Sequence, residues 1–248
     1  HRSILCGRNF EYFSEDPLLA GAQVAEEIQG AQAKGVYAFI KHFALNDQET
    51  NRTHMLATWT NEQALREVYL RPFEIGVKQG GAHAVMSAFN YIGTTYAGAH
   101  PELLNTVLRQ EWGFQGMVLT DYFAGYGYQN ADQIVRNGGD FMLATLDIDI
   151  AKVNTQSDAG LAQMRRASHN ILYTVANSWM YENGQPEVER NTWEYITWVV
   201  AGALILALVG LEVVALRRYR ARAAAGAESA PPTLDTGEGD GPRGGGAE

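Results

Sequence analysis

The feature that most constrains this chain is a run of 22 residues, Tyr195 to Leu216, in which Glu212 is the only charged side chain. At about 1.5 Å per residue, a helix of this length covers roughly 30 Å of hydrocarbon. The run therefore predicts one transmembrane helix over residues 193–216, with the lipid bilayer as its partner. The alternative is a buried helix of a soluble domain, but no later segment offers the apolar surface to cover such a helix.

The two ends of this run differ in chemistry, which predicts its orientation. Aromatic side chains that favour the membrane interface stand at one end, at Trp193, Tyr195 and Trp198. Basic side chains follow the other end, at Arg217, Arg218, Arg220 and Arg222. The positive-inside rule then predicts a single-pass protein of the cell membrane, with the domain before the span extracellular and the C-terminus cytoplasmic. Residues 217–248 are basic, then rich in Ala, Gly, Pro and acidic side chains, which predicts a disordered tail.

The first 180 residues alternate short apolar runs with longer amphipathic stretches, the pattern of repeated βα units. Strands are expected at Tyr37–Phe43, Ala84–Phe89, Gly116–Thr120 and Phe141–Ala144. Helices are expected at Pro17–Lys34, Asn61–Gln79, Pro101–Trp112, Ala131–Asn137 and Ala159–Ser178, with Asp16 capping the first and Thr60 the second. This pattern favours an α/β fold with a parallel sheet, either open and doubly wound or closed as a barrel. Residues 181–192 turn polar and are expected to be a linker.

Composition excludes several classes of protein. A net charge of −9 disfavours a nucleic-acid partner, since phosphate binding needs clustered Lys and Arg that most of the chain lacks. A single cysteine, Cys6, excludes an internal disulfide and a cysteine-based zinc site. No metal is expected.

Polar side chains stand where three of the expected strands end. These are Lys41 and His42, then Asn90 after Phe89, and Asp121. In a parallel α/β fold such positions face the ligand. A carboxylate beside an ammonium and an imidazole suits a polyhydroxylated substrate. Taken singly, each position also fits a structural role: a helix cap for Asp121, a solvated Lys41 and a core His42. An aldolase-type barrel with Lys41 as a Schiff-base amine is a further alternative, but it leaves Asp121 unexplained.

Four blocks of sequence, at residues 6–17, 41–49, 64–73 and 111–122, together resemble glycoside hydrolase family 3, the β-glucosidase family. The resemblance implies a (β/α)8 barrel and retaining hydrolysis of oligosaccharides or β-glycosides at the non-reducing end, without a cofactor. Asp121 matches the catalytic nucleophile, and Arg8, Lys41 and His42 match residues that bind sugar hydroxyls. Phe89 stands in the substrate-binding block where most relatives carry Tyr. We expect Lys41 or Arg8 to lower the pKa of Asp121.

The resemblance covers only part of the family pattern. It predicts a partial (β/α)8 TIM-type barrel, the C-terminal half, over residues 1–180. Residues 167–177 resemble the end of the barrel in members with reversed domain order, so we expect an N-terminal α/β domain of the same protein as a partner and the acid/base residue outside this chain. This chain alone is then expected to be inactive. The alternative is a natural truncated protein, a non-catalytic sugar-binding or vestigial surface protein.

Overall fold

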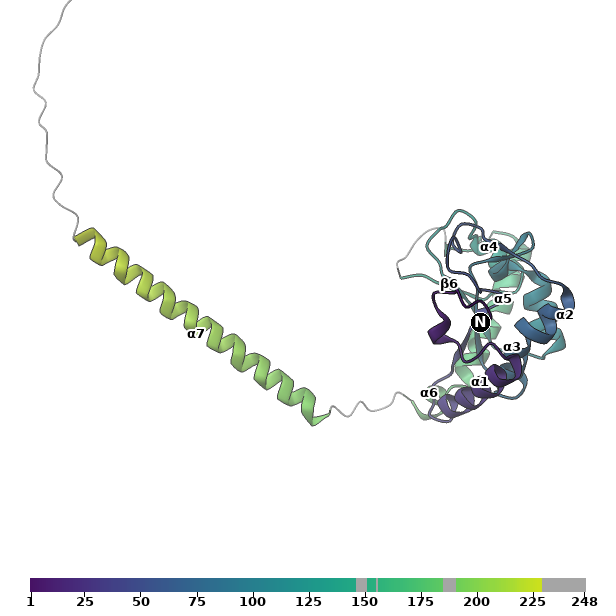
Figure 1. Ribbon diagram of the computed structural model, residues 1–248, viewed down its shortest axis with the longest axis horizontal. Coiled ribbons are helices and arrows are strands. Elements are labelled where there is room, and N and C mark those ends of the chain that lie inside the picture. Colours follow the sequence, from purple (N-terminus) through teal and green to yellow (C-terminus); the bar gives the residue numbers. More distant parts are fainter. Residues whose placement is uncertain (146–150, 155, 185–190, 229–248) are drawn as a thin grey trace, which may run out of the picture. The chain divides into compact units, whose positions relative to one another are not determined.

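The computed structural model describes residues 1–145, 151–154, 156–184 and 191–228 of the chain. It divides the chain into two units, His1–Pro186 and Glu187–Glu248, which are taken separately here. The first unit contains the parallel sheet and its helices, and the second contains α7 (Figure 1).

The main sheet has four parallel strands: β1 (Phe39–Phe43), β3 (Ala84–Ser87), β6 (Met117–Tyr122) and β7 (Phe141–Leu143). All four expected strands are thus confirmed, with ends shifted by one or two residues. Ile40 pairs with Val85, which pairs with Val118, and all three side chains are buried. β1 is irregular between Ile40 and Phe43, where the Lys41–His42 and Phe43–Ala44 peptide bonds are cis.

The order of the strands decides between the two architectures that the sequence left open. In the sheet the order is β1-β3-β6-β7, the same as the order along the chain. A doubly wound sheet reverses its order at a switch point, whereas a barrel adds each strand beside the previous one. The described strands therefore have the arrangement of part of a barrel.

Helices separate consecutive strands of the main sheet, as βα units require, and further helices precede β1 and follow β7. Those of the first unit are α1 (Pro17–Gln32), α2 (Glu62–Ala64), η2 (Leu65–Tyr69), α3 (Arg71–Lys78), η4 (Glu102–Glu111), α4 (Ala131–Arg136), α5 (Asp158–Ala176) and α6 (Trp179–Asn183). Short 3-10 turns, η1 (Asn9–Glu11) and η3 (Ala97–Ala99), complete them. Buried side chains of α1, η4 and the strands form the main core, among them Ile28, Phe43, Leu70, Val85, Leu104, Leu108 and Val118.

Two details of the helices differ from expectation. Asp16 does cap α1, but the cap of α2 is Asn61 and not Thr60: the Asn61 side chain accepts a bond of 2.8 Å from the amide of Ala64. The single helix expected over Asn61–Gln79 is divided, because Leu70 N–H bonds to the carbonyl of Leu65 five residues earlier, the spacing of a π turn. α6 also occupies the first residues of the expected linker, whose remainder at 185–190 lies outside the described residues.

A small second sheet was not predicted. It contains β2 (Ala57–Thr58), β4 (Tyr91–Ile92) and β5 (Thr95–Tyr96). Strands of two residues carry too little periodicity to be read from a sequence.

Polar contacts at the start of β6 fix this strand from the end opposite Asp121. Thr174 of α5 accepts a bond of 2.9 Å from the amide of Met117. The buried carboxylate of Asp140 accepts from the amide of Val118 at 2.8 Å and from Arg109 at 2.6 Å. The strand that carries Asp121 is thus tied to α5, to η4 and to the turn before β7.

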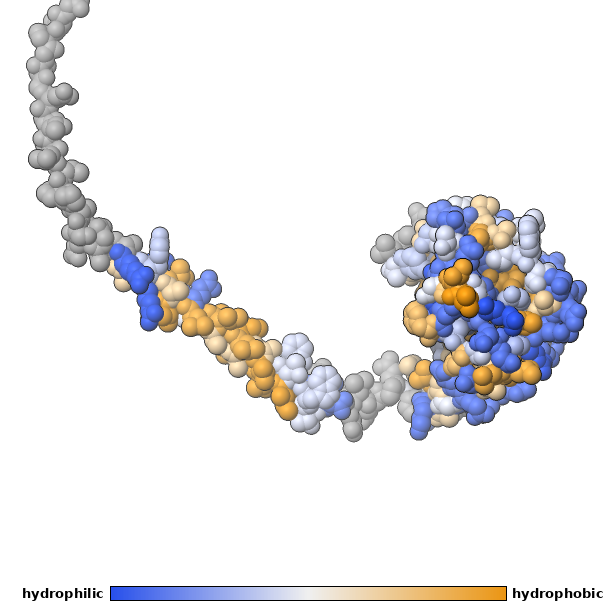
Figure 2. All heavy atoms as spheres, in the orientation of Figure 1, coloured by the Kyte–Doolittle hydropathy of each residue, from blue (hydrophilic) through white to orange (hydrophobic). Residues whose placement is uncertain are grey.

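The second unit contains α7, which runs from Thr192 to Glu228 and therefore continues past the expected end of the span at residue 216. Within the described residues, Thr192–Arg222 is the helix long and apolar enough to cross a membrane, and no residue of its apolar window is buried. Figure 2 shows a hydrophobic band along the middle of α7. Residues 229–248, the rest of the expected disordered tail, lie outside the described residues.

Candidate active site

The strand ends bring the expected site residues together at one edge of the main sheet. Lys41 and His42 belong to β1 and Asp121 to β6, so all three lie towards the C-terminal ends of parallel strands. Arg8 comes from the segment before η1 and reaches the same group, with its Nη2 atom 3.4 Å from Nε2 of His42. Four residues from three distant parts of the sequence therefore form one polar cluster.

Asp121 is nearly buried and is held from two sides. One carboxylate oxygen, Oδ1, accepts a bond of 2.7 Å from the amide of Tyr122. The other, Oδ2, lies 3.3 Å from Nη1 of Arg52 and 3.4 Å from Nε2 of His42. These contacts fix the orientation of the carboxylate, as a nucleophile requires.

Arg8 and Lys41 lower the pKa of Asp121 as expected, but the pKa is raised overall. Burial is the largest effect on this carboxyl, and the Tyr122 amide and the positive charges of Arg52, Arg8 and Lys41 only partly offset it. The expectation counted the neighbouring cations and left out the loss of water around the carboxylate.

His42 is a neutral imidazole in this cluster. Burial, followed by the charges of Arg8, Lys41 and Arg52, lowers its pKa to about 2. Its other ring nitrogen, Nδ1, is 2.5 Å from the hydroxyl of Tyr12. Tyr12 therefore orients the ring, and a neutral imidazole presents a hydrogen-bonding nitrogen to its surroundings over the physiological pH range.

A carboxylate holds the two arginines of the site together. Glu49 forms an ion pair with Nε of Arg8 through Oε1 and another with Nε of Arg52 through Oε2, each at 3.0 Å. The two guanidinium groups are thereby fixed on either side of one carboxylate. The negative charge of Glu49 offsets their mutual repulsion, so that Arg8 stays close to His42 and Arg52 stays close to Asp121.

Lys41 is paired with Glu11, which also lies 3.5 Å from Nη1 of Arg8. Burial opposes ionisation of Glu11, but Lys41, Arg8 and Arg52 outweigh it and hold the pKa of Glu11 below its ordinary value. Glu11 is therefore a fixed negative charge that positions the ammonium of Lys41.

Phe89 follows β3 and has only 2% of its surface exposed. Its ring lies under the guanidinium of Arg52, whose Cζ atom is 4.6 Å from the ring centroid, and it contacts Tyr126 edge-to-face. The structure thus places Phe89 behind Arg52, as the surface on which that side chain rests.

Arg52 is the residue that sequence reasoning missed. It contacts Asp121, Glu49 and Phe89 at once. Arg52 stands three residues after the matched block at residues 41–49, in the loop after the expected strand, and only its nearness to that block could have pointed to it. The described residues contain no group of three His, Cys, Asp or Glu side chains able to hold a metal ion.

Comparison with known proteins shows which family this chain resembles. The profile described as "Glycosyl hydrolase family 3 N terminal domain" matches residues 2–168. A beta-glucosidase of Rhizobium radiobacter is 49% identical over 126 residues, which are 51% of this chain and 15% of that protein. A beta-glucosidase of Ruminococcus albus is 38% identical over 184 residues, covering 69% of this chain and 19% of the relative.

Solved structures give the same result. Beta-glucosidase 3B from Thermotoga neapolitana, in complex with alpha-D-glucose, superposes with a TM-score of 0.66 and 36% identity, over 79% of this chain and 28% of that one. A beta-glucosidase from Kluyveromyces marxianus superposes with a TM-score of 0.65 and 30% identity, over 77% of this chain and 24% of that one. The chain thus spans less than a third of the length of these relatives.

Proposed function

Because this chain belongs to glycosyl hydrolase family 3, we propose that it carries the nucleophile half of a retaining β-glycosidase site. In this proposal Asp121 attacks the anomeric carbon of a terminal, non-reducing β-D-glycoside and forms a glycosyl-enzyme, which water then hydrolyses. The observation that carries the proposal is that the buried Asp121 carboxylate contacts both Arg52 and His42 at the C-terminal end of a barrel strand.

The cations around Asp121 suit the binding of a sugar. Arg8, Lys41 and the neutral His42 offer hydrogen bonds to ring hydroxyls, and each is already oriented by an acidic or phenolic partner. Preorganised donors of this kind stabilise charge that develops at the substrate without having to reorganise. The positive charges of Arg52, Arg8 and Lys41 favour the ionised form of Asp121, which is the form that acts as a nucleophile.

The acid/base residue comes from another part of the protein in this proposal. A general acid needs a raised pKa, but that of Glu11 is lowered. Both oxygens of Glu49 are bound to arginines. We infer that a domain outside residues 1–248 supplies the second carboxyl group, roughly 5 Å from Asp121.

A cavity of about 270 Å³ beside β1 supports the completion of the barrel by further strands. Its walls include apolar side chains of α1, β1 and α3, such as Val24, Ile40 and Phe73, together with the site residues Lys41 and His42. Among the described strands β1 pairs only with β3, so its other edge is open to a neighbour.

We further propose that α7 spans the cell membrane once, with the glycosidase unit outside and the C-terminus in the cytoplasm. The exposed apolar stretch of α7 and the arginines that follow it support this topology. Protease treatment of intact cells should then release the unit by cleavage before Thr192. Release only after the cells are permeabilised would indicate the opposite topology, with the glycosidase unit in the cytoplasm.

A slow substrate with an activated leaving group tests the proposed nucleophile directly. 2,4-Dinitrophenyl 2-deoxy-2-fluoro-β-D-glucoside needs no general acid for its departure, so it should label Asp121 even where the acid/base residue is absent. Peptide mass spectrometry should place the fluoroglucosyl group on Asp121 and find none in Asp121→Asn. A label on another residue would overturn the assignment.

The alternative function is non-catalytic sugar binding at the cell surface, and the pairing of both nearby glutamates with cations favours it. Turnover separates the two functions. The chain alone should hydrolyse an unactivated alkyl β-glucoside little or not at all, whereas the protein extended by its N-terminal α/β domain should hydrolyse it. Failure of that longer protein to do so, together with measurable glucose binding, would support the binding function.

A further inference from the structure

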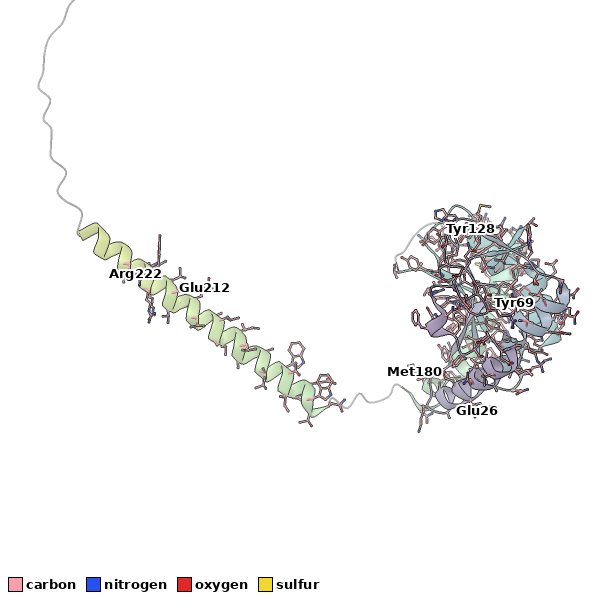
Figure 3. All side chains as sticks on the ribbon, in the orientation of Figure 1. Glu26, Tyr69, Tyr128, Met180, Glu212 and Arg222 are labelled. Atoms are coloured by element: carbon pink, nitrogen blue, oxygen red, sulfur yellow. The ribbon has the colours of Figure 1, made fainter. Side chains whose placement is uncertain are left out.

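The end of α7 carries a dense group of arginines on a continuous helix. Arg217, Arg218, Arg220 and Arg222 follow directly after Leu216, and all four are exposed. The helix continues unbroken through them to Glu228. In the described part of the chain none of the four forms an ion pair with an acidic side chain. Figure 3 shows Glu212 and Arg222 projecting from the same helix, and Figure 2 shows hydrophilic residues on α7 beyond its hydrophobic band.

The helical repeat distributes these charges around the axis. Successive residues are rotated by about 100°, so the four arginines face three sides of the helix and the exposed Tyr219 faces the fourth. They span five steps along the axis, or about 7.5 Å. The headgroup layer on each side of a bilayer is roughly 5–7.5 Å thick, from half the difference between the total and the hydrocarbon thickness. The height of the group therefore matches the upper end of the thickness of one headgroup layer.

We propose that these four arginines form a collar that binds the phosphate groups of anionic phospholipids. The proposal rests on the membrane span proposed for α7. A guanidinium donates two parallel hydrogen bonds to a phosphate, and lipids with a net negative charge add attraction that zwitterionic lipids lack. Because the collar is part of the same rigid helix as the apolar stretch, its depth in the leaflet is fixed by the span.

Lipid binding by the full chain in neutral detergent tests the collar. Native mass spectrometry compares retention of phosphatidylglycerol with phosphatidylcholine of the same acyl chains. Each arginine contributes up to about fivefold, so we expect phosphatidylglycerol to bind at least tenfold more tightly. R217Q/R218Q removes two of the four charges and should reduce this preference by up to about 25-fold, whereas R217K/R218K keeps the charges and should retain most of it. The control R136Q/R165Q removes two exposed arginines from the first unit and should leave the preference unchanged.

Three outcomes would overturn the proposal. The first is equal binding of the two lipids by the unaltered chain. The second is an equal loss of preference in R136Q/R165Q, which would show a general charge effect. The third is a preference that arises only after removal of residues 229–248, which would show that acidic residues of the tail occupy the arginines in the intact chain. Resistance of the chain to carbonate extraction tests the span separately. A chain that stays in the membrane but shows no lipid preference would therefore contradict the collar and leave the proposed span standing.

Discussion

Nε2 of His42 lies 3.4 Å from Oδ2 of Asp121, although the two residues stand on β1 and β6, which β3 separates in the sheet. The contact joins a neutral imidazole to a carboxylate whose pKa is raised, both as a result of burial. Loss of water thus acts on the two partners in opposite directions and moves each towards its uncharged form. The positive charges of Arg52 and Arg8 oppose this effect at Asp121, because they favour its ionised carboxylate.

The buried His42 should make the protein less stable in acid. Its pKa is about 2 in the folded chain, below the ordinary 6.5, so the unfolded chain binds more protons between these values. The free energy of unfolding should therefore fall as the pH drops below 6.5, by up to about 1.4 kcal/mol per pH unit from this group. Urea unfolding of the full chain in neutral detergent at pH 7 and pH 5 measures the slope. His42→Gln should have a shallower slope, and equal slopes would contradict the assignment.

Asp121→Asn should stabilise the fold at neutral pH while it removes the proposed nucleophile. Because burial raises the pKa of Asp121, its ionised form is less favourable in the folded than in the unfolded chain. The resulting cost appears as the pH rises through the unfolded value of 3.8 and persists above the folded pKa. We expect a higher free energy of unfolding for the variant at pH 7, as measured by urea unfolding. The gain in stability should vanish at pH 3. A variant less stable than the unaltered chain at pH 7 would contradict the view that burial of the ionised Asp121 costs stability.

Arg52 should control the ionisation of Asp121. Its charge is one of the effects that oppose the burial-driven rise in the pKa of Asp121. Arg52→Leu should therefore raise that pKa further, as followed by carbon-13 NMR of the carboxyl group. Arg52→Lys keeps the charge and should give a smaller rise. An unchanged titration in Arg52→Leu would show that the contact at 3.3 Å has no electrostatic role.

Asp140→Ala should destabilise the protein strongly, by about 3–5 kcal/mol, because it leaves the guanidinium of Arg109 buried without its partner. The carboxylate of Asp140 has no exposed surface and also accepts from the amide of Val118 and from Asn170. The matched control is Glu111→Gln, which breaks the exposed pair with Arg66 and should cost about 0–1 kcal/mol. Comparable losses in the two variants, measured by urea unfolding, would contradict this reading.

Gly116→Ala should prevent or weaken the start of β6. A Cβ atom at residue 116 would lie 2.0 Å from the carbonyl oxygen of His83, so the backbone has to move. Gly127→Ala is the control, because nothing lies within 4 Å of the corresponding position. We expect a melting temperature lower by several degrees, about 4 °C for each 1 kcal/mol lost. The control should melt within about 2 °C of the unaltered chain.

Much of the site follows from the sequence, because the residues at strand ends are predictable wherever strands are. Lys41, His42 and Asp121 could be placed at one edge of a parallel sheet before the structure was known, since β1, β3 and β6 are short apolar runs with clear boundaries. Arg8 was found by resemblance alone. Arg52 lies in an irregular loop, where no periodicity predicts the direction of a side chain.

The sequence by itself determined the elements: the apolar stretch of α7, the βα repeats and the residues where strands end, all of which depend on local periodicity. The tertiary structure decided the order of the strands, the burial of His42 and Asp121, and the bridge that Glu49 makes between Arg8 and Arg52. The physical reason is that a shift in pKa and an ion pair both depend on the distance to groups far away in the chain and on the water displaced between them. Those distances and that loss of water are set only when the strands pack side by side.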